Sequence, residues 1–127
     1  MANTITITGT VNLAKSTGGD LAAGSATYVV TQTDADGKFS SATLKLSTSG
    51  TLVVLPKGNI SFGEAYLFVQ NLSSTTGEDV IMAKESGGTN EIGRIKPGGV
   101  WMGVRTADVY ANSAAGTPTI KVTYIQV

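Results

Sequence analysis

Short stretches of alternating apolar and polar residues, separated by glycine-rich turns, constrain the fold of this chain most strongly. Residues 4–8 (TITIT) alternate at period two, and residues 42–47 (ATLKLS) do so again. Because successive side chains of a β-strand point to opposite faces, this period predicts half-buried strands. The longest candidate helix, residues 11–26, is interrupted by glycines, each of which costs about 1 kcal/mol in a helix interior. An all-β protein is therefore expected.

The β-type runs recur roughly every 8–12 residues, which is typical of sandwiches and jelly rolls. Residues 65–70 (AYLFVQ) form the most apolar run and are predicted to be a central strand covered on both faces. No linker divides the chain, so we expect one domain over residues 1–127, an antiparallel β-sandwich or jelly roll of about eight to ten strands. The other candidate strands are residues 4–8, 26–32, 42–47, 51–55, 79–83, 91–95, 100–105, 109–111 and 120–125.

The composition argues against several classes of function. The 127 residues include no His and no Cys, so the usual base for a serine nucleophile and all thiol chemistry are missing, and neither an enzyme nor a cofactor is expected. Nine basic and nine acidic residues are dispersed, so no nucleic-acid partner is expected. No apolar run approaches the roughly 20 residues of a membrane helix, and the first residues do not resemble a signal peptide. A soluble protein made in the cytoplasm is expected.

Two acidic pairs are weighed as sites. Asp34 and Asp36 precede Gly37 with the spacing found at the start of a calcium-binding loop, but the residues that follow supply no acidic ligand. The Asp-Gly pair also favours a type I′ hairpin turn. The turn is the preferred interpretation, with no metal. Glu78 and Asp79 are adjacent, and neighbours on a strand point to opposite faces, so they are interpreted as a solvated turn rather than an acid–base pair.

Three aromatic residues, Trp101, Tyr110 and Tyr66, are candidate anchors. Such side chains fill cores, anchor interfaces between subunits, or form sugar-binding platforms. Core or intersubunit burial is the preferred interpretation for Trp101, because it lies between Val100 and Met102. A carbohydrate platform remains the alternative.

The backbone suggests two further features. Pro97, Gly98 and Gly99 are predicted to form a structural turn whose glycines adopt positive φ. The strands near the two chain ends are candidates for edge pairing with a neighbouring subunit, because an exposed edge carries unpaired N–H and C=O groups. The candidate interface residues are Thr4, Ile5, Thr6, Ile7, Ile120, Val122 and Tyr124.

Several segments resemble small β-rich virion proteins of tailed bacteriophages. Residues 68–72 (FVQNL) match a strand that ends in an Asn-Leu pair, and residues 92–100 (IGRIKPGGV) match a Pro-Gly turn that leads into an apolar strand. Residues 109–125 match a closing segment with a Tyr-Ala pair and a final apolar strand. The opening residues 4–11 also look like the start of that group, and the resemblance is strongest over residues 65–127. Gly99 stands where many of these proteins carry an acidic residue.

The resemblance implies a structural protein of the virion, most simply a capsid decoration (cement) protein that binds and stabilises the head shell. Its partners would be the major capsid protein or other virion subunits, and a homo-oligomer is expected, with a trimer as the best guess. A receptor- or glycan-binding module of a tail fibre or bacterial surface is the alternative.

Overall fold

The computed structural model describes residues 3–13, 22–32, 38–48, 52–61, 64–85, 87 and 90–126. Every regular element within these ranges is a β-strand, which confirms the all-β prediction. The strands are β1 (Asn3–Leu13), β2 (Ala22–Gln32), β3 (Phe39–Lys45), β4 (Val53–Val54), β5 (Ala65–Asn71), β6 (Val80–Ala83), β7 (Glu91–Ile95), β8 (Val100–Arg105), β9 (Tyr110–Ser113) and β10 (Thr119–Gln126).

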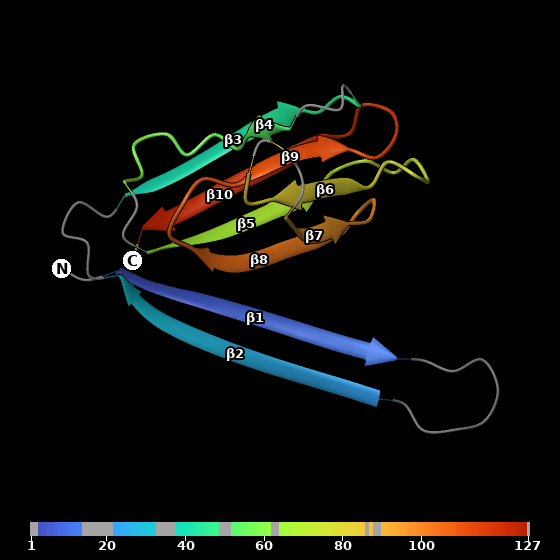
Figure 1. Cartoon of the computed structure of the whole chain (residues 1–127). Helices are drawn as coiled ribbons and strands as arrows, with labels where there is room; N and C mark the ends of the chain where they lie inside the picture. The colour runs from blue at the N-terminus through green and yellow to red at the C-terminus, as the bar shows by residue number, and fades with distance from the viewer. Residues whose placement is uncertain are drawn as a thin grey trace.

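Eight strands form two antiparallel four-stranded sheets, drawn as the layered body in Figure 1. We call β3-β10-β5-β8 sheet I and β4-β9-β6-β7 sheet II. The pairings are nested along the chain: β3 pairs with β10, β4 with β9, β5 with β8, and β6 with β7. A long antiparallel hairpin wrapped into two layers produces this nesting, which is the connectivity of a jelly roll. The predicted fold class is confirmed.

The core lies between the two sheets. Leu67 and Val69 of β5 are fully buried, and so are Val80 and Met82 of β6 in the other sheet. β5 is central, because it pairs with both β10 and β8, as its apolar sequence predicts. Burying an aliphatic side chain of this size stabilises a fold by about 1.5–3 kcal/mol.

Trp101 occupies space that two glycines leave open. A Cβ built on Gly93 in β7 would lie 2.7 Å from Trp101 Nε1, and one on Gly103 in β8 would lie 2.6 Å from Trp101 Cη2. Real Cβ atoms do not approach other atoms so closely, so the indole requires glycine at both positions. Isolated glycines within strands often mark such close approaches. Trp101 is half-buried and packs against the core cluster.

β1 and β2 form a separate two-stranded hairpin, which Figure 1 draws outside the two sheets. Its strands pair without interruption from Asn3↔Gln32 to Leu13↔Ala22. The side chains that the structure describes in this hairpin, those of Thr4, Thr6 and Thr8, are exposed.

The final strand is not an edge strand, so its proposed role in subunit pairing must be corrected. β10 lies between β3 and β5, and Ile120, Val122 and Tyr124 are fully buried in the core. Nested pairing brings the last strand of the sandwich beside the first and places a further strand on its other side. These three residues therefore stabilise the fold and are not available to a neighbouring subunit.

Candidate functional site

The face of sheet I that points away from the core is the candidate site, and we call it the outer face. The pairing register aligns residues across the sheet in three rows on this face. The rows are Phe39, Ile125, Tyr66 and Val104; Ser41, Thr123, Phe68 and Met102; and Thr43, Lys121, Gln70 and Val100.

Large apolar side chains on the outer face are open to solvent. Phe39 is 58% exposed, Val100 61%, Met102 47% and Val104 46%. Three of them follow one another at alternate positions of β8, which forms an edge of sheet I. Contiguous apolar surface on a folded protein marks an interaction site far more often than scattered apolar residues do. The outer face has this property.

A shallow hollow of about 360 Å³ lies within the outer face. Phe68 and Ile125 contribute apolar surface to it, whereas Gln70, Lys121 and Thr123 contribute polar groups. The hollow therefore combines apolar contact area with a few hydrogen-bonding groups and one ammonium group. This composition suits a protein neighbour or a polar ligand with an apolar side.

Strand β8 carries residues of low polarity on both of its faces. Val100, Met102 and Val104 occupy one face, while Trp101 and Gly103 occupy the other face and pack together. Both faces of this strand are thus low in polarity, although β8 pairs on one side only. Sequence analysis missed the outer face because an apolar run at both phases resembles a fully buried strand.

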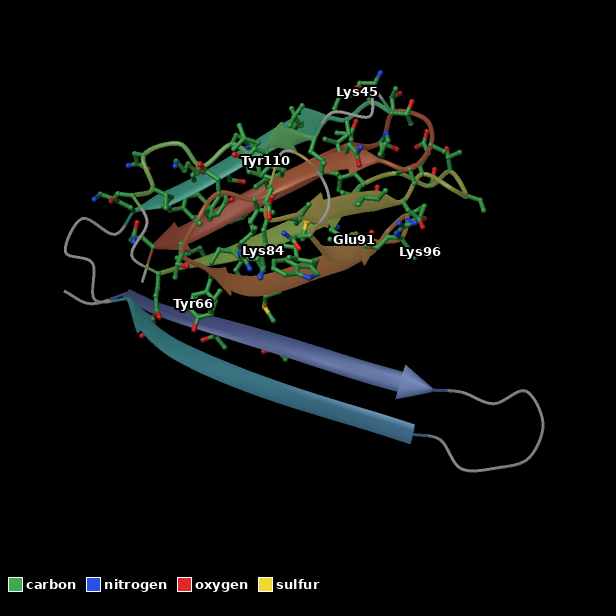
Figure 2. All side chains as sticks on the ribbon, in the orientation of Figure 1. Lys45, Tyr66, Lys84, Glu91, Lys96 and Tyr110 are labelled. Atoms are coloured by element: carbon green, nitrogen blue, oxygen red, sulfur yellow. The ribbon has the colours of Figure 1, made fainter. Side chains whose placement is uncertain are left out.

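The three candidate aromatic anchors do not form one platform. The register places Tyr66 on the outer face of sheet I, where it is 8% exposed, and Trp101 on the core side of the same sheet. Tyr110 is half-buried in β9 of sheet II. Figure 2 shows Tyr66 and Tyr110 on opposite sides of the sandwich. A sugar platform built from these three residues is therefore inconsistent with the fold.

The turn between β7 and β8 is a structural element that is held by Asn71. Gly98 has a φ of +75°, the left-handed conformation that favours glycine, whereas Gly99 is not among the positive-φ glycines. The amide of Gly98 donates to the carbonyl of Asn71, and the amide of Asn71 donates to the carbonyl of Gly99, each at 3.0 Å. The turn that contains Pro97 is thereby fastened to the end of β5.

The side chain of Asn71 is fully buried and satisfies two further carbonyl groups. Its Nδ2 donates to the carbonyls of Glu78 at 2.7 Å and Ile95 at 3.1 Å, and its Oδ1 accepts from the amide of Ser73 at 3.1 Å. The residue joins β5, the segment before β6 and the end of β7. The polar side chain of Asn71 therefore has a structural role.

The interpretation of Glu78 and Asp79 as a solvated turn is wrong for Asp79. The Asp79 residue is only 6% exposed, and its Oδ2 accepts from Lys96 Nζ at 2.7 Å. Glu78 is half-buried, accepting from the hydroxyl of Ser73 and, at 3.2 Å, from the amide of Thr117. The acids serve separate contacts because adjacent side chains diverge, so they do not face one substrate.

The remaining site predictions have different outcomes. Asp34 and Asp36 lie outside the described residues. Thr4 and Thr6 are exposed in β1, whereas the side chains of Ile5 and Ile7 are outside the described part. Within the ranges that the structure describes, no three acidic residues gather as a metal site would require.

Burial gives one ionisable group an unusual pKa. Tyr124 is fully buried, and this loss of hydration, with a smaller contribution from the negative charge of Asp108, raises the pKa of its phenol to about 12. Asp108 itself pairs with Lys57 at 3.0 Å. Tyr124 therefore remains neutral at all physiological pH values.

Comparison with protein-family models, with curated proteins and with solved structures finds no significant match. None of the described segments forms a helix of the length and apolarity that crossing a membrane would demand.

Proposed function

We propose that this protein is a structural subunit of a tailed-bacteriophage virion, a decoration protein that binds the head shell through protein–protein contacts. The observation that carries the proposal is the outer face, where Phe39, Val100, Met102 and Val104 are each about half exposed or more. Apolar area of this kind gains free energy when a protein neighbour removes it from water.

The fold and the sequence support the same role. Jelly rolls form many viral capsid domains, but they also form lectin domains and other proteins. The fold alone therefore does not decide between a capsid role and a glycan-binding role. The choice rests on the resemblance of residues 68–72 and 92–100 to small virion proteins of tailed phages. Within this chain the two segments that carry the resemblance contact each other, because Asn71 is hydrogen-bonded to Gly98 and Gly99 of the turn.

A glycan-binding module of a tail fibre is the second candidate, and the hollow beside Phe68 favours it. There an aromatic ring lies near the amide of Gln70 and the hydroxyl of Thr123, a combination that suits the apolar and polar sides of a sugar. Replacing Gln70 with Ala separates the candidates. It should weaken a hydrogen-bonded glycan strongly, but it leaves the apolar contact with a protein shell nearly unchanged.

The direct test is electron microscopy of virions purified from the phage that encodes this chain. The proposal predicts density for the jelly roll at regular positions on the head, with sheet I turned towards a protein neighbour. Density at a tail fibre tip would favour the second candidate. Absence of the protein from purified virions would overturn both.

A further inference from the structure

The two four-stranded sheets end in four edge strands, which are β3 and β8 in sheet I and β4 and β7 in sheet II. An edge strand presents unpaired N–H and C=O groups to any chain that approaches it, and proteins protect such edges with short strands, bulges, prolines or charged side chains. Strand β8 lies at one margin of the sandwich (Figure 1) and pairs with β5 alone among the described strands. The four edges differ in their protection.

Three of these edges are protected. Strand β4 is only two residues long. Strand β7 carries the exposed charged residues Glu91 and Arg94, and its pairing with β6 contains a register shift. Strand β3 begins directly after Lys38 and ends at the exposed Lys45. Each of these features hinders the approach of another strand.

Strand β8 has none of these protections. Its residues 100–104 (VWMGV) contain no charge and no proline, and its register with β5 runs without a shift. The side chains of Val100, Met102 and Val104 are exposed beside the edge. A flat, uncharged and apolar edge of this kind is a template for pairing with another chain.

The backbone groups of alternate residues in β8 point to the free edge. The amide of Asn71 donates to the carbonyl of Gly99 at 3.0 Å, so Gly99 belongs to a hydrogen-bonded pair with the end of β5. Bonded and non-bonded pairs alternate along an antiparallel ladder, so every second residue after Gly99 is also bonded to β5. The N–H and C=O groups of Val100, Met102 and Val104 therefore point away from β5.

We propose that β8 of one copy pairs antiparallel with β8 of a second copy, across a twofold axis that passes Met102. The axis keeps the outer faces of both copies on the same side of the joined sheet, so the exposed residues pair among themselves. Met102 lies opposite Met102 of the second copy, and Val100 lies opposite Val104 of the second copy. Each free N–H then meets a C=O, and apolar side chains lie opposite apolar side chains.

The partner is a second copy because this edge is complementary to itself. A twofold axis matches the free donors of one β8 to the free acceptors of the other at the same spacing, and it opposes no charges. The contact yields a dimer, whereas the sequence suggested a trimer. It goes beyond the proposed function, because pairing at the edge joins the two outer faces into one surface and leaves both open to another partner.

The contact is narrow, so it should be weak. Strand β8 has 6 residues and is about 20 Å long, and a sheet layer is about 10 Å thick, so the paired edges bury roughly 200 Å² per copy. A stable interface buries about 800 Å² per partner. The dimer should therefore dissociate on dilution and form where copies are crowded together.

Disulfide trapping tests the pairing. The chain has no cysteine, so Met102→Cys introduces a single thiol at the proposed axis, within disulfide reach of the same thiol in the second copy. Val54→Cys is the matched control, because Val54 is 49% exposed and Met102 47%, but Val54 lies in β4 of sheet II. In concentrated protein under mild oxidation, Met102→Cys should form linked dimers at least about tenfold faster. Equal rates would overturn the proposal.

Two further thiols distinguish edge pairing from stacking of two outer faces. In the proposed register, Val100 lies four residues along the paired strands from Val100 of the second copy, about 13 Å, which is beyond the reach of a disulfide. Val100→Cys and Val104→Cys should therefore link slowly when each is alone and rapidly to each other when mixed. Self-linking of each variant at the rate of the mixture would contradict the pairing.

A backbone variant gives an independent measurement. Met102→Pro removes an N–H that points to the free edge, where edge strands tolerate proline, whereas Met102→Ala shortens the side chain and keeps the N–H. Sedimentation at high concentration should show self-association of wild type and Met102→Ala, and none of Met102→Pro. Equal association of the two variants, whether retained or lost, would contradict the proposal. Circular dichroism checks that Met102→Pro is folded, and if it is not, the thiol variants decide.

The same proteins separate this inference from the proposed function. Protein that binds phage heads but never links through β8 would defeat this inference alone. Protein that links through β8 but does not bind heads would defeat the proposed function alone.

Discussion

The amide of Gly98 donates a hydrogen bond to the carbonyl of Asn71 at 3.0 Å, which fastens the turn before β8 to the end of β5. Gly98 holds its positive φ of +75° with open space where a Cβ would project. Any cost of a side chain at this position therefore comes from the backbone conformation and not from a clash.

Gly98→Val should lower the free energy of unfolding by about 1–3 kcal/mol, because a β-branched residue resists positive φ. Urea unfolding monitored by circular dichroism measures the change. Gly87→Val is the control, since Gly87 has open space and its φ is not positive. Equal stability of the two variants would contradict the assigned turn conformation.

Asn71→Ala should destabilise the protein by about 2–3 kcal/mol. The substitution leaves the buried carbonyl of Ile95 without its donor at 3.1 Å and removes the donor to Glu78, and an unsatisfied buried acceptor costs about 1–3 kcal/mol. Asn90→Ala, at an exposed position, should change stability by less than about 0.5 kcal/mol. Thermal unfolding of both variants at one pH decides the matter.

Gly103→Ala should destabilise the fold by about 1–3 kcal/mol, because its Cβ would meet the Trp101 ring at 2.6 Å. The penalty should shrink when Trp101 is also replaced by Leu, which frees the space. A double-mutant cycle measures this coupling. Additive effects would show that the ring and the glycine do not compete for one volume.

Stability should fall as the pH rises from about 10 to about 12. The unfolded chain releases the Tyr124 proton near its ordinary pKa of 10.0, whereas burial raises the folded pKa to about 12. Between these values the folded state binds more protons, so the free energy of unfolding decreases with pH, in total by on the order of 2 kcal/mol.

Tyr124→Phe tests this assignment in two ways. The variant should lack the phenolate absorbance that appears near pH 12 in wild type, and its stability should decline less steeply above pH 10. A wild-type absorbance titration without any transition near pH 12 would contradict burial of this phenol.

The local sequence pattern was enough to predict where the strands of the sandwich lie along the chain. It was not enough to predict the order of the strands within the sheets. The apolar character of residues 65–70 was sufficient to predict a central strand, and β5 is central in its sheet. The position of β10 could not be predicted, because it depends on nested pairing between strands far apart in the chain. For the same reason Asn71 resembled an ordinary strand end, although its carbonyl partners lie 7 and 24 residues away.

The outer face could not be predicted either, because its exposure depends on how the sheets pack. Val100, Met102 and Val104 alternate with Trp101 and Gly103, so both faces of β8 are low in polarity. A period of two assigns alternate residues to opposite faces of the strand. Only the packing of the two sheets determines which of these faces is exposed to water. Strands at residues 4–8 and 26–32 were predicted, but their pairing in a sheet separate from the other two was not.

The central claim is that the outer face binds a protein neighbour in the virion. Its most direct test is the binding isotherm of the purified protein on phage heads that lack it, compared with Val100→Glu and Val54→Glu. The account predicts saturable binding for wild type and for Val54→Glu, and an affinity at least about tenfold lower for Val100→Glu, or about 1.4 kcal/mol. Equal binding of all three proteins, or no binding by wild type, would contradict it.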